Sequence, residues 1–138
     1  MDKLNIIIID DIAVAQVKST NGPAGAASAF NKLESKMNGL RGRKMYGVFY
    51  PQLGDYFACV KLDQEFPDDM GFARGIIPGG KYAKQAIENW GSKVEEISPS
   101  FEKLTEHCRQ NGYAIDNSRT SIEFYRSQQE LFIMLPVK

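Results

Sequence analysis

The sequence has no surplus of charge of either sign, because its 138 residues include 17 Lys and Arg against 17 Asp and Glu, and its pI is near 6.6. Proteins that bind nucleic acids through the phosphate backbone usually carry a clear positive surplus. The densest basic cluster, Arg41, Arg43 and Lys44, lies in a Gly-rich loop and is typical of a solvated connector. We therefore expect no direct contact with nucleic acid.

Residues that bind metals or carry redox chemistry are also scarce. The chain has two cysteines, Cys59 and Cys108, and one histidine, His107. Neither cysteine has a partner at metal-ligand spacing, which predicts two reduced core residues, no disulfide, and no metal or other cofactor. His107 and Cys108 are neighbours on a predicted helix, where adjacent side chains point about 100° apart. They therefore cannot form the nucleophile and base of a catalytic pair.

Long hydrophobic runs are absent as well. Runs such as Ile6–Ile9 are far shorter than the roughly 20 residues that a bilayer-spanning helix needs, and no signal-like cleavage pattern follows Ile9. We therefore expect a cytoplasmic protein with no membrane partner. With 43% apolar and 25% charged residues the composition is that of an ordinary globular chain, and its length predicts one domain over residues 1–138.

The first half of the chain predicts a strand, a helix and two further strands. β-branched residues crowd Leu4–Ile9, and the extended pattern resumes at Ile12–Val17 after a pair of aspartates. From Ala24 to Asn38 the apolar residues recur at helical spacing. Two extended segments, Met45–Tyr50 and Tyr56–Leu62, then flank a turn whose Pro, Gly and Asp residues favour a hairpin.

The second half repeats this order. Gly71–Ile77 and Lys81–Ile87 are extended around a Pro-Gly-Gly turn, and Ser121–Tyr125 and Leu131–Val137 are strands after a second helix. Four apolar residues of that helix each lie 71 positions after an apolar residue of the first helix: Ala26 and Ile97, Phe30 and Phe101, Leu33 and Leu104, Met37 and Cys108.

This correspondence predicts an α+β fold built by duplication. We expect two halves, about 1–70 and 71–138, each a strand-helix-strand-strand unit, related by a pseudo-twofold axis. The sheet would hold about eight antiparallel strands with two helices, and a ligand cleft would lie between the halves, because grooves at such internal interfaces favour ligands.

Short motifs at matching places in the chain point to a known family. Ile77–Ala83 reads Ile-Pro-Gly-Gly-Lys-Tyr-Ala, Ile122–Tyr125 reads Ile-Glu-Phe-Tyr, and Leu135–Val137 reads Leu-Pro-Val, with Ala13–Ala15 and Gly22-Pro23 in the first half. In order and spacing these resemble the GyrI-like, or AraC-type effector-binding, domains over nearly the whole chain. The resemblance implies a stand-alone multidrug-binding member with a cleft between its two halves and no room for a separate DNA-reading helix-turn-helix.

The resemblance also implies a ligand class, bulky and flat lipophilic cations, and it implicates the acid of the Glu-x-Tyr strand, here Glu123. From strand alternation alone, Glu123 could instead be a solvent-facing residue between inward-pointing Ile122 and Phe124. A carboxylate buried among aromatic rings would attract a delocalised cation by charge and by stacking. Tyr125 shares the face of Glu123 because side chains alternate with a period of two residues.

Six residues are therefore candidates for ligand binding. They are the acid and the aromatic residues that could line the cleft: Glu123, Tyr125, Tyr82, Trp90, Tyr46 and Phe57. No two residues are candidates for a catalytic pair, and no residue is a candidate metal ligand. Trp90, the only tryptophan, is more often a core anchor than a binding platform.

Three functions follow from these observations. The first is non-enzymatic binding of hydrophobic cations in the cleft, with transcription regulated only through a partner. The second is a small hydrolase of electrophilic compounds, in which Glu123 acts as a general base with a pKa raised by burial. The third is a protein-interaction module like the gyrase-inhibiting members of the family, although no such surface is identified by the sequence. Nothing in the sequence predicts an oligomeric state.

Overall fold

The computed structural model describes residues 3–37, 39 and 42–138, so Asn38 and Arg41 of the sequence predictions lie outside the described residues. The strands are β1 (Asn5–Ile9), β2 (Ile12–Lys18), β3 (Thr20–Pro23), β4 (Met45–Tyr50), β5 (Asp55–Lys61), β6 (Ala73–Ile77), β7 (Gly80–Glu88), β8 (Ser121–Tyr125) and β9 (Glu130–Pro136). The helices are α1 (Ala26–Glu34) and α2 (Ile97–Gln110), and two single 3-10 turns, η1 (Trp90–Ser92) and η2 (Val94–Glu96), precede α2.

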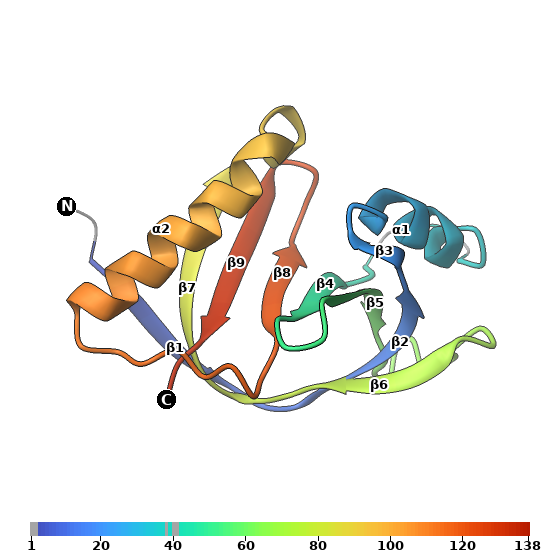
Figure 1. Cartoon of the computed structure of the whole chain (residues 1–138). Helices are drawn as coiled ribbons and strands as arrows, with labels where there is room; N and C mark the ends of the chain where they lie inside the picture. The colour runs from blue at the N-terminus through green and yellow to red at the C-terminus, as the bar shows by residue number, and fades with distance from the viewer. Residues whose placement is uncertain (1–2, 38, 40–41) are drawn as a thin grey trace.

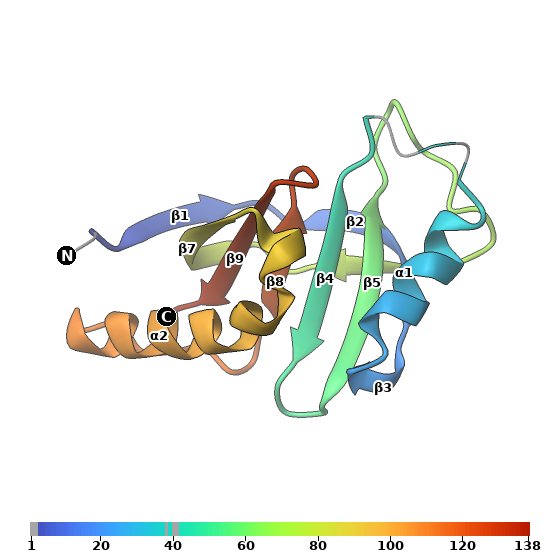
Figure 2. The same ribbon diagram turned by 90° about the horizontal axis from the view of Figure 1, so that it is seen from above.

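Eight of these strands form one curled antiparallel sheet in the order β1-β7-β9-β8-β4-β5-β2-β6 (Figure 1). Both helices pack on the same face of the sheet: α1 contacts β2 and β5, and α2 contacts β7 and β9. The middle strands β8 and β4 lie between the two helices when the molecule is seen from above (Figure 2). The predicted α+β class, with eight antiparallel strands and two helices, is confirmed.

The Pro-Gly-Gly turn after β6 does not fold the chain back on itself. β6 pairs with β2 and β7 pairs with β1, so the segment β1-β2 and the segment β6-β7 run past each other as two long antiparallel strands. Between the two paired regions, the side chain of Asp11 accepts a hydrogen bond from the backbone N–H of Gly79 at 2.6 Å. Each predicted half of the chain therefore supplies one outer strand to the part of the sheet formed by the other half.

The sheet has a regular internal correspondence. β1 and β2 begin at residues 5 and 12, and β6 and β7 begin at 73 and 80, an offset of 68 in both cases. β4 and β5 begin at 45 and 55, and β8 and β9 begin at 121 and 130, offsets of 76 and 75. Because β4 and β8 are neighbours, Gly47 lies directly opposite Glu123, which is 76 positions further along the chain.

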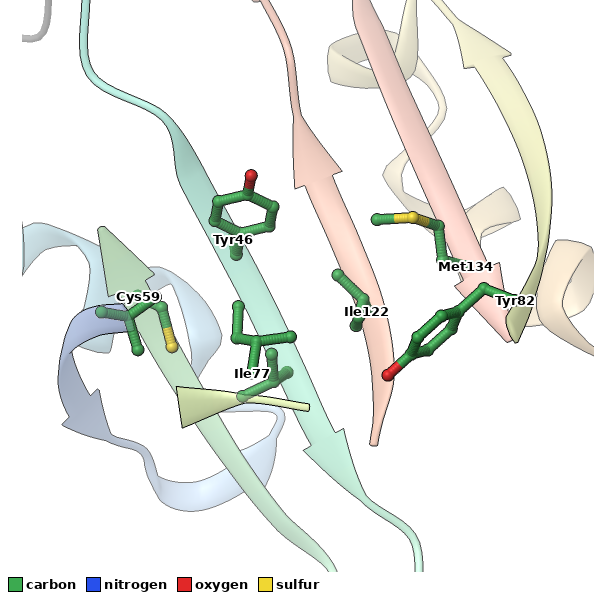
Figure 3. Packing of buried hydrophobic residues seen from close by; sticks show 8 residues of the cluster. Tyr46, Cys59, Ile77, Tyr82, Ile122 and Met134 are labelled. Carbon is green, nitrogen blue, oxygen red and sulfur yellow. The ribbon is translucent and has the colours of Figure 1, made fainter. Parts of the chain in front are cut away.

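The two faces of the sheet hold separate hydrophobic clusters. On the face away from the helices, every strand of the sheet contributes to one cluster, which includes Ile122, Tyr46 and Tyr82 (Figure 3). On the helix face, one cluster lies under α1 and another under α2, and Tyr125 contacts both. The alternation of β8 therefore sends Ile122 and Phe124 to one face and Glu123 and Tyr125 to the other.

The first helix ends earlier than the sequence predicts. α1 ends at Glu34, four residues before the predicted end, because the next two turns close with tighter bonds from Lys36 N–H to the carbonyl of Leu33 and from Met37 N–H to that of Glu34. α2 begins at Ile97 directly after η2, which places Pro99 in the first turn, where its missing N–H costs no hydrogen bond. No helix in the described residues is long and apolar enough to cross a membrane.

A pair of isoleucines tests the hydrophobic cluster of Figure 3. Ile122 is fully buried and Ile8 is 78% exposed. We expect Ile122→Ala to lower the free energy of unfolding by about 2–5 kcal/mol, because it leaves a cavity in the cluster of Figure 3. Ile8→Ala should change it by less than about 0.5 kcal/mol. Urea denaturation of both variants measures the difference, and equal losses would contradict this core.

Candidate functional site

A cavity of about 620 Å³ lies between α1 and α2 and is open to solvent. Strands β4, β5 and β8 supply Gly47, Tyr56 and Glu123 to it, and one side of α2 forms a wall. This volume is within the range that holds drug-sized ligands. The lining residues are Pro23, Ala26, Gly47, Phe49, Pro51, Tyr56, Val94, Ile97, Ser98, Phe101, Glu102, Thr105, Arg109, Ile115, Asp116, Asn117, Arg119, Ser121, Glu123, Tyr125, Leu135 and Pro136.

The carboxylate of Glu123 is held by two phenols. The hydroxyl of Tyr56 donates a hydrogen bond to Oε1 of Glu123 at 2.5 Å, and the hydroxyl of Tyr125 donates to the same oxygen at 2.8 Å. Among the described residues no hydrogen bond is made to the other oxygen, Oε2, and no Lys or Arg forms an ion pair with this carboxylate. The residue is only partly buried and lines the cavity, so Oε2 is the oxygen available to a ligand.

The absence of a side chain at Gly47 makes this arrangement possible. A Cβ atom on Gly47 would overlap the Tyr56 hydroxyl and the Oε1 atom of Glu123. Cross-strand pairing sets the contact, because directly opposite residues of an antiparallel pair have their Cβ positions only about 4.5–5.5 Å apart. The glycine therefore leaves space on the helix face of β4 for the phenol and the carboxylate.

Two aromatic side chains hold the ring of Tyr125 in place. Phe30 of α1 packs edge-on against it with ring centroids 5.3 Å apart, and Trp90 of η1 does the same at 5.0 Å. The indole N–H of Trp90 donates to the carbonyl of Ser127 at 2.9 Å, which fixes the indole to the turn between β8 and β9. The ring of Phe30 also lies edge-on to the ring of Tyr56, with ring centroids 6.5 Å apart. Both phenols that bind Glu123 are thus positioned by packing before any ligand arrives.

Burial dominates the acid–base properties of this cluster. Loss of solvent raises the pKa of Glu123 above its ordinary value, and the hydrogen bonds from Tyr56 and Tyr125 oppose this rise only in part. The pKa of each tyrosine is also raised, first by burial and then by the nearby carboxylate. Both phenols therefore stay protonated and act as hydrogen-bond donors.

Two other charged residues of the cavity neutralise each other. Asp116 accepts hydrogen bonds from Ser118 and from Nε of Arg119 at 2.9 Å, and these bonds lower the pKa of Asp116 to about 2. The guanidinium of Arg119 also donates to the carbonyls of Lys81 and Val137. This pair ties the loop before β8 to the end of β9. In the described part of the chain, no group of three or more His, Cys, Asp or Glu residues is placed to hold a metal ion.

The structure brings two of the six sequence-predicted residues, Glu123 and Tyr125, into the cavity wall. Trp90 lies behind Tyr125 and is not among the lining residues. Tyr46, Phe57 and Tyr82 point to the opposite face of the sheet, where they belong to the cluster of Figure 3 or pack against it. Their side chains are used in the core: Tyr46 stacks on Phe124, and the hydroxyl of Tyr82 donates to the carbonyl of Pro78 at 2.6 Å.

Sequence reasoning did not include Tyr56, the nearest hydrogen-bond partner of Glu123. It selected the adjacent Phe57, and a shift of one residue along a strand moves the side chain to the other face of the sheet. Tyr56 shares its face with Ala58 and Val60, which lie under α1, but the intervening Cys59 is buried as well, so alternation along β5 does not mark the cavity side. On β4, Tyr46 is likewise one residue from Gly47, which lines the cavity.

Two comparisons of the sequence with known proteins gave different results. The family model described as the GyrI-like small molecule binding domain matches residues 17–138. No curated protein matches the sequence.

Solved structures share the fold at low sequence identity. The integron cassette protein VCH_CASS2 from the mobile metagenome of Vibrio cholerae is 19% identical with a TM-score of 0.66, over 98% of this chain and 95% of that one. SAV2435, solved bound to tetraphenylphosphonium, is 14% identical with a TM-score of 0.63, over 99% and 94%. The C-terminal domain of EcmrR is 11% identical with a TM-score of 0.72, over 99% and 97%. At these identities the likeness is one of fold.

A substitution at Gly47 tests the packing of the carboxylate cluster. We expect Gly47→Ala to lower the free energy of unfolding by about 1–3 kcal/mol, because the added methyl group must displace Tyr56 or Glu123. In a Tyr56→Phe background the same change should cost less, since the hydroxyl that it meets is gone. Gly91→Ala is the control, because its Cβ would meet only one atom, at 3.9 Å. Equal costs in both backgrounds would contradict the proposed contact; denaturant unfolding measures all four variants.

The raised pKa of Glu123 has a predictable effect on stability. As pH rises from the ordinary value of 4.5 toward the raised pKa, the unfolded chain loses this proton before the folded protein does. The folded state therefore loses stability in that window. Since Glu123→Gln removes the titration, we expect the melting temperature of the variant relative to wild type to increase with pH and then level off. Glu102→Gln, which removes an exposed acid of the same cavity, is the control. A difference that does not change with pH would contradict the raised pKa.

Proposed function

Because the chain belongs to the GyrI-like small molecule binding domain family, we propose that it binds bulky apolar organic cations in the cavity between α1 and α2. Glu123 supplies the charge that attracts them. The observation that carries this proposal is a carboxylate at the cavity surface with one oxygen fixed by two phenols and the other without a described partner.

The balance of energies at Glu123 supports a cationic ligand. Removing a carboxylate from water costs several kcal/mol in a protein, whereas a hydrogen bond to a charged group returns about 1.5–3 kcal/mol. Two such bonds do not restore the full loss, which agrees with the raised pKa of Glu123. A cation about 4 Å from the carboxylate would add roughly 4 kcal/mol of attraction at an effective dielectric constant of 20. The site therefore gains most from a ligand with a positive charge.

The rest of the lining supports a ligand with broad apolar surfaces. Pro23, Ala26, Phe49 and Pro51 line the cavity on the side of the first half of the chain, and Phe101 and Leu135 on the side of the second. Such residues bind by area and impose little hydrogen-bond geometry, so several cations of similar size would be accepted. The related structure of SAV2435 with tetraphenylphosphonium gives a first probe of this class.

A small hydrolase is the second function that this cavity would allow, because the open Oε2 atom of Glu123 and its raised pKa are properties of a general base. The other acids of the cavity give less support to catalysis. Asp116 is bound to Arg119 and Ser118, and Glu102 is exposed on α2. We favour binding, because no second carboxylate of the described residues is hydrogen-bonded to Glu123 to share the proton transfers.

A matched pair of ligands tests the charge requirement. Methyltriphenylphosphonium and triphenylphosphine oxide have nearly the same size, but only the first carries a positive charge. We expect wild type to bind the cation more tightly, and Glu123→Gln to weaken cation binding at least tenfold while leaving the oxide nearly unchanged. Cation affinity should also rise with pH, because binding of the cation displaces the proton from Glu123. Isothermal titration calorimetry at two pH values measures both effects.

Tyr46→Phe is the matched control, because this tyrosine lies in the core on the opposite face. It should leave both affinities within about twofold. Equal affinity of wild type for the cation and the oxide, or no loss in Glu123→Gln, would remove the acid from the binding mechanism.

A further inference from the structure

The two sides of the cavity differ in polarity. One side of α2 carries Ser98, Glu102, Thr105 and Arg109 at intervals of three and four residues, so all four share one face of the helix, and all four line the cavity. The facing part of α1 contributes Ala26 alone, next to Pro23. α2 also supplies Ile97 and Phe101, so its wall is mixed, with four polar side chains, whereas the wall from the first half of the chain is mostly apolar.

Two of the five charged residues that line the cavity are already bound within the protein. Asp116 and Arg119 bind each other and neighbouring backbone groups. Arg109 is different. In the described residues its only ion pair joins Nη1 to Oε2 of Glu106 at 3.9 Å, which is beyond hydrogen-bond distance, and both side chains are at least 60% exposed. Pairs of this kind contribute little, so the guanidinium of Arg109 is available to a ligand.

We propose that the ligands preferred by this cavity are aromatic cations that also carry a carboxylate or another anionic group, which Arg109 binds. This inference rests on the function proposed above and defines the ligand class more narrowly. A ligand of this class would place its positive charge near Glu123, its rings against the apolar wall, and its anionic group at the end of α2.

The spacing along α2 keeps Arg109 apart from Glu102, the other charged residue of this wall. They are seven residues apart, which is about 10 Å along a helix. This separation is too long for an ion pair, so Glu102 leaves the guanidinium of Arg109 to a ligand. A guanidinium also binds a carboxylate through two parallel hydrogen bonds, a geometry that an ester cannot reproduce. Arg109 would therefore distinguish an acid from its ester.

The exposure of Arg109 sets the expected size of the effect. Its side chain is 66% exposed, so solvent and salt weaken its attraction for an anion. Arg109 would change which cation is preferred much more than it changes the total affinity, since Glu123 and the apolar walls also bind the ligand.

Tetramethylrhodamine and its methyl ester test this inference, because both carry the same xanthene cation and only the first has a free carboxylate. Fluorescence anisotropy gives the affinity of each dye. We expect Arg109→Gln to weaken binding of the free acid about three- to fivefold relative to the ester, and added salt to reduce the difference. Arg74→Gln is the matched control, because Arg74 is 64% exposed and lies on the edge strand β6, outside the cavity. Mass spectrometry of the ester after incubation shows whether it has been hydrolysed to the acid.

The outcomes separate this inference from the function on which it rests. Loss of the preference for the acid in Arg109→Gln, but not in Arg74→Gln, supports a carboxylate site at Arg109. An unchanged ratio of acid to ester affinity in Arg109→Gln overturns it, even where Glu123→Gln weakens both dyes. Failure of both dyes to bind wild type contradicts the proposed function itself and, with it, this inference.

Discussion

The hydrogen bonds to Glu123 depend on the missing side chain at Gly47. Antiparallel pairing of β4 and β8 places these two residues directly opposite each other in the middle of the sheet. Any Cβ at position 47 would occupy the space that the Tyr56 hydroxyl needs to reach the carboxylate. The second phenol, Tyr125, is fixed by Phe30 from α1 and Trp90 from η1, so elements from both halves of the chain position one carboxylate.

The sequence contained enough information to place Glu123 and Tyr125 together, but not enough to place their neighbours. Residues 123 and 125 lie on one strand, and the period of two puts them on one face whatever the rest of the sheet does. Which residues of β4 and β5 lie beside Glu123 and Tyr125 depends on the pairing register of β4 with β8 and of β4 with β5. Both faces of these two strands are largely buried, so their sequences show no alternation that identifies the cavity side. Tyr46 and Phe57 are each one residue away from Gly47 and Tyr56, and so lie on the face of the sheet opposite the cavity.

The connectivity was harder to predict than the elements. Strand positions followed from β-branched and aromatic residues, and most strand ends agree within one or two residues. The direction of the chain after Pro78 could not be predicted from the sequence, because a Pro-Gly-Gly sequence is compatible both with a reversal and with a bend in a continuing strand. The long-range contacts decide: β6 pairs with β2, and Asp11 binds the backbone of Gly79. The residue types in the turn do not indicate which strands the flanking segments pair with.

The residues that determine which ligand binds are expected at positions where the two halves of the chain differ. Phe30 and Phe101 lie 71 positions apart at matching places on the two helices. Phe101 lines the cavity, whereas Phe30 packs against Tyr56 and Tyr125 behind the carboxylate. α2 is also longer than α1, 14 residues against nine, and its extra turn carries Arg109. Strands of the sheet line the cavity. An acid opposite a glycine, and the polar residues of α2 opposite Pro23 and Ala26, make the sides of that cavity chemically different. A ligand that binds there in one orientation must itself have a charged end and an apolar side, because only such a molecule gains more in one orientation than in the other.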